Sequence, residues 1–240
     1  MLEVMNIETW GMEQAIRSMR NPMNSWERSD SYYGCLDEKC KYCSIHENIC
    51  INYEKNYIVG KNDLELMRKL YKGGSEHRKY LRSIIISLDI NAPLYWWKEF
   101  DTYKVGTVSN SCSTMHKIHA KEFCLDDFSH DHLLEPCVEH LKETIEILNQ
   151  LRDCYINYEE YMNDYLMEHP NGTFPGKKIV WWQMIQLLPS SYNQFRTVTM
   201  NYETAVNIIH QRRNHKLDEW RKLCDFLLCE CPYLRAIMSE

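Results

Sequence analysis

An alternating run of apolar and polar residues at 84–91, with the sequence IIISLDIN, limits most strongly how this chain can fold. In a β-strand, successive side chains point to opposite faces. One face of this strand would carry only apolar side chains, namely Ile84, Ile86, Leu88 and Ile90. The other face would be partly polar. The pattern therefore predicts a strand in a sheet that buries one face.

Helical patterns surround this strand. A short N-terminal strand precedes a helix at 11–20, which Asn21-Pro22 ends because the residue before proline disfavours the α region. The next helix is capped by Asn62 and ended by Gly73-Gly74. Further helices are predicted at 75–82, 93–100, 132–167, 181–189, 202–213 and 216–228, a second strand at 194–201, and a long polar loop at 102–119. This order of elements predicts an α+β fold.

The composition fits one globular domain. Of the 240 residues, 44% are apolar and 12% aromatic, which is enough to fill a substantial core. The sequence shows no internal repeat and no flexible glycine- or serine-rich linker. We therefore expect residues 1–240 to form a single domain with a polar, cysteine-rich surface insertion at about 24–61.

Charge and hydropathy exclude several partners. The formal net charge of −6 gives no general attraction to nucleic acid, and no basic stripe compensates for it. No apolar run approaches the roughly 20 residues that span a bilayer, and the first residues lack the pattern of a signal peptide. We therefore expect a cytoplasmic protein with reduced thiols that binds neither nucleic acid nor membrane.

The insertion carries a cluster of potential metal ligands. Cys40 and Cys43 have the spacing that lets two thiolates share one zinc ion. Cys35, His46 and Cys50 lie close by in the sequence. Four of these side chains, with Cys35, Cys40, Cys43 and Cys50 as the thiol set, would complete a structural zinc site. Only one Cys-x-x-Cys pair is present, so unligated loop thiols are the alternative.

An arginine near the C-terminus shares a helix face with apolar residues. Arg212 lies at offsets of three, four and seven residues from Ile209, Ile208 and Ala205. A guanidinium turned toward the core needs an anionic partner. That partner is either a carboxylate of the chain, which would make an internal salt bridge, or the phosphate of a ligand. The spacing alone does not separate these alternatives.

The sequence around Arg212 resembles a known family. Leu188-Pro189, a predicted strand that ends in Asn201, Arg212 eleven residues later and a closing helix recur in this order in the flavin-dependent thymidylate synthases. The resemblance covers most of residues 62–238. It implies that family's fold, with a central antiparallel sheet and long helices, and it implies that Arg212 contacts the phosphate of a deoxyuridine nucleotide.

The family's signature loop aligns with residues 102–115 of this chain, but nearly every signature residue differs. The three opening basic positions are Thr102, Tyr103 and Lys104, and an Asn-Glu pair is Ser109-Asn110. By position, the resemblance implies a nucleotide site that also includes Glu99, Cys112, Ser113 and Thr114. The family's arginine before Leu-Pro is Ile185 here, and its flavin-contacting histidine falls on His77.

Three functions follow as hypotheses. The resemblance implies an FAD- and folate-dependent enzyme that methylates a deoxyuridine nucleotide and assembles as a homotetramer. The altered signature favours a divergent protein that binds a pyrimidine nucleotide, with thymidylate synthesis weak or lost. The third hypothesis is an interaction scaffold with an empty pocket. Because Trp96 and Trp97 lie on a helix face, we expect them to be core residues.

Overall fold

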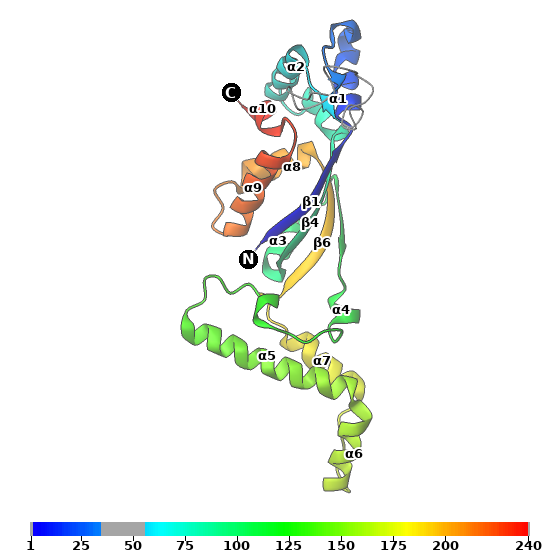
Figure 1. The fold of residues 1–240 in the computed structure, drawn as a ribbon, viewed down its shortest axis with the longest axis vertical. Helices are drawn as coiled ribbons and strands as arrows, with labels where there is room; N and C mark the ends of the chain where they lie inside the picture. Colours follow the sequence, from blue (N-terminus) through cyan, green and yellow to red (C-terminus); the bar gives the residue numbers. More distant parts are fainter. Residues whose placement is uncertain (1, 35–55, 240) are drawn as a thin grey trace, which may run out of the picture. The chain divides into compact units, whose positions relative to one another are not determined.

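The computed structural model of the chain describes residues 2–34 and 56–239 (Figure 1). The predicted zinc ligands Cys35, Cys40, Cys43 and Cys50 lie outside the described residues. The strands are β1 Glu3–Trp10, β2 Tyr32–Tyr33, β3 Tyr57–Ile58, β4 Ile85–Pro93, β5 Thr107–Ser111 and β6 Asn193–Asn201. The α-helices are α1 Met12–Arg20, α2 Lys61–Lys72, α3 Leu94–Phe100, α4 Thr114–Lys117, α5 Glu135–Ile156, α6 Tyr158–Glu168, α7 Lys177–Leu187, α8 Tyr202–Arg212, α9 Asp218–Glu230 and α10 Leu234–Met238. Short 3-10 helices are η1 Asn21–Met23, η2 Trp26–Arg28, η3 Arg78–Ser83 and η4 Leu125–Asp127.

The chain divides into two compact units. Unit 1 comprises Met1–Glu3, Ile90–Thr102 and Asn110–Thr197. Unit 2 comprises Val4–Asp89, Tyr103–Ser109 and Val198–Glu240. The expectation of a single domain over residues 1–240 stays a prediction. Among the helices that the structure describes, none has both the length and the apolar character needed to cross a membrane.

The predicted alternating strand is confirmed as β4. Ile86, Leu88 and Ile90 of β4 and Ile84 just before it are fully buried, and the intervening residues are partly exposed. The sheet has the order β1-β4-β6-β5, and β2 pairs with β3 in a separate two-stranded ladder. The predicted α+β fold with an antiparallel sheet is therefore confirmed.

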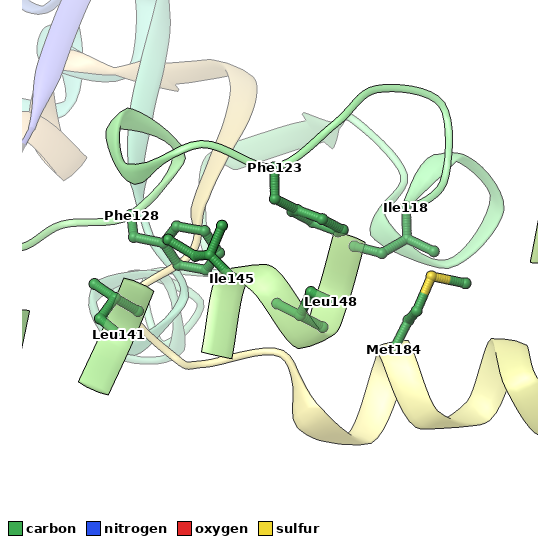
Figure 2. Packing of buried hydrophobic residues seen from close by; sticks show 7 residues of the cluster. All are labelled: Ile118, Phe123, Phe128, Leu141, Ile145, Leu148 and Met184. Atoms are coloured by element: carbon green, nitrogen blue, oxygen red, sulfur yellow. The ribbon is translucent and has the colours of Figure 1, made fainter. Parts of the chain in front are cut away.

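The core of unit 1 forms around the long helix α5 (Figure 2). Leu141, Ile145 and Leu148 recur at helical spacing and project from α5 toward Phe123 and Phe128. Met184 of α7 lies beside Ile118 at the other end of the cluster. The predicted helix at 132–167 is interrupted at Asn157, whose non-helical backbone separates α5 from α6.

The predicted loop at 102–119 is wrong in part, because it contains β5 and α4. Strand β5 is the last strand in the order of the sheet. Val108, Ser109, Asn110 and Ser111 are all exposed. A strand without a buried apolar face has no alternating pattern, so periodicity could not indicate β5.

A buried carboxylate organises the N-terminal part of unit 2. Asp63 is completely buried in the first turn of α2, and its Oδ1 accepts a 2.6 Å hydrogen bond from Nε of Arg20. Its Oδ2 accepts from the hydroxyl groups of Ser29 and Ser31, at 2.7 and 2.6 Å. Burial alone would raise the pKa of Asp63, but these hydrogen bonds and the charge of Arg20 outweigh burial and lower it.

The start of α2 also differs from the prediction of an Asn62 cap. Gly60 occupies the N-cap position. The carboxylate of Asp30, far earlier in the sequence, accepts hydrogen bonds from the backbone N–H groups of Asn62 and Asp63 at 2.9 and 3.1 Å. The helix is therefore capped by a distant side chain, which local sequence does not indicate.

We predict that Asp63→Asn lowers the free energy of unfolding by about 3–5 kcal/mol near pH 7, because it leaves the buried Arg20 without its charged partner. The pKa of Asp63 is lower in the folded chain than its ordinary value of 3.8. The carboxylate therefore stabilises the fold above that value, and the stabilisation is lost as the pH falls through the folded pKa. Urea unfolding of both proteins near pH 7 and pH 3 should show the difference shrinking in acid.

The exposed Asp164 offers a matched control, since Asp164→Asn removes the same charge from the surface of α6. It should change the free energy of unfolding by less than about 0.5 kcal/mol. A wild type and an Asp63→Asn variant with equal stabilities near pH 7 would contradict the assigned role of Asp63.

Candidate functional site

The junction between β6 and α8 positions the candidate site in unit 2. Asn201 ends the strand and caps the helix, because its Oδ1 accepts from the backbone N–H of Thr204 at 2.9 Å. The hydroxyl of Thr204 donates to the carbonyl of Val105 at 3.0 Å. The backbone N–H of Asn201 donates to the carbonyl of Gly106 at 3.2 Å. These bonds hold segment 103–109 against the first turn of α8.

Gly106 makes this close approach possible. Its φ of +73° lies in the region that favours glycine. A Cβ atom at this position would lie 2.5 Å from Nδ2 of Asn201 and 3.0 Å from Oγ1 of Thr204. No other residue fits here without a shift of the helix cap, so Gly106 fixes where Tyr103 meets α8.

Arg212 lies at the end of α8 between two aromatic rings. Its Nε donates to the hydroxyl of Tyr103 at 2.9 Å, and that hydroxyl donates to Oε1 of Gln211 at 2.9 Å. The guanidinium carbon lies 4.8 Å from the ring centroid of Trp220 and 5.7 Å from that of Tyr103. We call Tyr103, Gln211, Arg212 and Trp220 the Arg212 site.

The predicted helix phase of Arg212 is confirmed, because Ala205, Ile208 and Ile209 on the same face are buried. Arg212 as a residue is nevertheless partly exposed. It stacks on the completely buried ring of Trp220, which gives a cation–π contact of about 0.5–2 kcal/mol and fixes the plane of the guanidinium. A cation held in one orientation and reachable from solvent can bind an anionic group.

The remaining predicted nucleotide residues are divided between the units. Lys104 and Ser109 belong to unit 2 and are exposed. In unit 1, Cys112, Ser113 and Thr114 border a hollow of about 270 Å³, together with the lysines Lys117 and Lys121. Asn110 is exposed on β5 just before this hollow. The structure thus brings Tyr103 to Arg212 in one unit and Cys112, Ser113 and Thr114 together in the other.

Several of these residues have local structural roles. The hydroxyl of Ser113 caps α4 by accepting from the backbone N–H of His116 at 3.0 Å. The hydroxyl of Thr102 donates to the carbonyl of Glu99 at 2.7 Å. Cys112 is exposed, and its backbone N–H donates to the carbonyl of Phe195 at 2.9 Å. These three hydrogen bonds stabilise the backbone conformation of the loop.

Sequence reasoning missed an arginine network in unit 1. Arg196 donates to Asp101 at 2.7 Å and to the side chain of Gln194 at 2.9 Å, and its guanidinium lies 4.2 Å from the ring centroid of Trp97. The buried Gln194 in turn donates to the carbonyl of Cys112 at 2.9 Å. Gln194 and Arg196 lie on the same face of β6 as the buried Val198 and Met200. Two polar residues in an otherwise apolar face were the sequence signal that could have indicated this network.

Other predicted residues lie away from such networks. Trp96 and Trp97 are buried, which confirms them as core residues. His77 is exposed at the start of η3, next to Gly73. Within residues 2–34 and 56–239, no group of His, Cys, Asp and Glu side chains is arranged to hold a metal ion. The structural zinc site at Cys35, Cys40, Cys43 and Cys50 stays a prediction.

Comparison with solved structures identifies the fold. One similar structure is thymidylate synthase X (ThyX) from Helicobacter pylori with FAD and dUMP, with 17% identity, a TM-score of 0.59, and coverage of 100% of this chain and 98% of that chain. A second structure, the flavin-dependent thymidylate synthase ThyX from the same organism complexed with FAD and dUMP, has 16% identity, a TM-score of 0.59, and coverage of 98% of each chain. No protein-family model matches the chain, and no curated protein matches it by sequence. The chain therefore has a ThyX-like fold.

We predict that Gly106→Ala destabilises unit 2 and disturbs the Arg212 site. Positive φ costs an L-residue about 1–2 kcal/mol, and the contact with Asn201 adds to this. Gly74→Ala is the matched control, because Gly74 has a φ of +91° but nothing within 4 Å of an added Cβ. Thermal unfolding should show a larger loss for Gly106→Ala, with a changed near-ultraviolet circular dichroism signal from the site's aromatic rings. Equal losses in the two variants would contradict the role of the close approach.

Proposed function

We propose that this ThyX-like chain binds a pyrimidine nucleotide, with Arg212 as the contact for its phosphate group. The observation that carries the proposal is the fixed guanidinium of Arg212, held by the hydroxyl of Tyr103 and the ring of Trp220. A planar guanidinium matches two phosphate oxygens and makes charge-assisted hydrogen bonds. Arg212 is partly exposed, which is consistent with contact to an anion from solvent.

The charge around Arg212 supports an anionic ligand. Lys104 follows Tyr103 directly, and Lys216 lies between α8 and α9; both are exposed. The chain as a whole carries a formal charge of −6, and Asp218 and Glu219 lie close to Lys216 in the sequence. Lys104 and Lys216 are therefore a local addition of positive charge, and exposed cations attract phosphate-bearing molecules.

The choice of nucleotide rests on the fold. The two similar ThyX structures contain dUMP, and the order of Leu188-Pro189, Asn201 and Arg212 resembles that family. Deoxyuridine monophosphate is therefore the first ligand to test. The homotetramer that the resemblance implies belongs to this proposal and is measurable by light scattering of the purified protein.

Catalysis is weak or lost in this proposal. The positions that correspond to the family's basic signature hold Thr102, Tyr103 and Lys104. The hydroxyl of Thr102 donates a hydrogen bond to the carbonyl of Glu99, and the hydroxyl of Tyr103 donates one to Gln211. Lys104 is the cation left in this stretch, so preorganised charge for the transfer of a one-carbon unit is missing.

The residues assigned to flavin do not fit that cofactor well. His77 is exposed beside Gly73, and the altered signature offers little positive charge to the two phosphate groups of FAD. The alternatives are a non-catalytic protein that binds or sequesters a nucleotide and an active FAD- and folate-dependent methylase of dUMP.

We predict that Arg212→Ala weakens the binding of dUMP at least ten-fold, because losing one charge-assisted contact costs about 1.5–3 kcal/mol. Isothermal titration calorimetry on the purified chain measures this. Arg213→Ala removes the same charge from the exposed neighbouring position and should change the affinity about two-fold or less. Arg212→Lys keeps the charge but loses the planar fork, so its affinity should lie between the two.

Equal affinities of the wild type and Arg212→Ala for dUMP would show that Arg212 has a structural role in unit 2 and does not contact the nucleotide. Thermal unfolding of each variant serves as the check that the fold is intact. An affinity lost equally in Arg213→Ala would mean that general charge, and no specific contact, attracts the nucleotide.

We further predict that turnover of dUMP to thymidylate is very low. The assay contains the purified chain, dUMP, FAD, reduced nicotinamide cofactor and methylenetetrahydrofolate, with the Helicobacter pylori enzyme as a positive control. A visible absorbance spectrum after incubation with FAD and desalting tests cofactor binding separately. Robust thymidylate formation together with a retained flavin band would contradict the proposed loss of catalysis. It would support the alternative of an active FAD- and folate-dependent methylase.

A further inference from the structure

Unit 2 contains a cavity of about 780 Å³ that none of the nucleotide residues borders. Four aromatic side chains contribute to its wall: Trp10, Tyr33, Tyr57 and Tyr233. Trp10 is 50% exposed and Tyr33 is 44% exposed. Large aromatic side chains that gather around an open cavity mark a binding site more often than scattered surface residues do.

The β2–β3 ladder places two of these rings edge to face, and we call this pair the corner of the cavity. Tyr33 of β2 lies opposite Tyr57 of β3 in the antiparallel ladder. Their ring centroids are 5.0 Å apart, and the ring planes meet at 69°. The hydroxyl of Tyr33 donates to Oε2 of Glu13 at 2.8 Å, so the carboxylate of α1 lies at the edge of this corner.

The other two rings are held by their own constraints. Trp10 ends β1, and Gly11 turns the chain into α1 with a φ of +87°. A Cβ on Gly11 would lie 2.0 Å from the carbonyl oxygen of Ser83, so the turn admits only glycine and the place of Trp10 is set. Tyr233 accepts a 3.0 Å hydrogen bond from the backbone N–H of Val59, which anchors its ring from the side of α10.

The charge of the cavity wall selects the ligand. Glu13 contributes a carboxylate, and none of the described residues that line the cavity is a lysine or an arginine. The faces of aromatic rings carry negative quadrupole potential and attract cations, most of all those that are weakly hydrated. The described lining therefore favours a cation over an anion.

We propose that this cavity binds an organic cation of the quaternary ammonium type, with the aromatic rings as its walls and Glu13 as its counter-charge. The size of the cavity leaves room for further parts of such a ligand beside the cationic group. This site shares no residue with the Arg212 site, so it holds or fails independently of nucleotide binding.

Choline and dimethylbutanol provide the test, because dimethylbutanol has carbon in place of the charged nitrogen and nearly the same shape. Saturation-transfer NMR and calorimetry on the full chain should show choline binding at least about five-fold more tightly than dimethylbutanol. Glu13→Gln keeps an acceptor for Tyr33 but loses the charge, so it should weaken choline and leave dimethylbutanol unchanged. Trp10→Ala should weaken both.

Tyr32 offers the matched control for Tyr33. Both are exposed residues of β2, but Tyr32 is not part of the cavity wall. Tyr33→Ala should reduce choline binding at least about five-fold, while Tyr32→Ala should retain it. Equal binding of choline and dimethylbutanol, no binding of choline to the full chain, or equal loss in both tyrosine variants would each overturn the proposal. Thermal unfolding shows whether each variant is folded.

Discussion

The helix cap at Asn201 is the constraint on which the candidate site depends. One side chain ends β6, starts α8 and lies against the turn at Gly106. The hydroxyl of Thr204 ties the same turn to the helix through the carbonyl of Val105. Segment 103–109 therefore follows α8, and Tyr103 reaches Arg212 at the end of that helix. A backbone constraint of this kind positions a side chain several residues away without contacting it.

Periodicity predicted the parts of the fold that bury apolar faces. The alternation of Ile84, Ile86 and Leu88 was sufficient for β4, and the offsets from Ala205 gave the phase of α8. Periodicity could not predict β5, because its exposed side chains carry no alternation. It also could not predict the cluster around Asp63, since Arg20, Ser29 and Ser31 reach this carboxylate from a distant part of the sequence. Contacts set by tertiary structure leave no local pattern.

Three residues between 102 and 115 have local structural roles. Ser113 caps a helix, Thr102 closes a turn on Glu99, and Tyr103 orients a guanidinium. In each case a neutral hydroxyl group makes a hydrogen bond within the chain. These hydrogen bonds lie within the chain itself, so they give the segment a structural role whichever ligand it binds.

Aromatic rings serve two electrostatically opposite purposes within unit 2. At the Arg212 site, Tyr103 and Trp220 hold a cation of the protein itself, which we propose binds an anion. In the cavity beside Glu13, the rings face space that no cation of the described lining fills, and the resulting surface attracts cations. The two sites differ in the source of the positive charge, which is an arginine of the chain at the Arg212 site and the proposed ligand in the cavity. Because ring faces favour a cation in both places, the position of one arginine decides which sign of ligand each aromatic group selects.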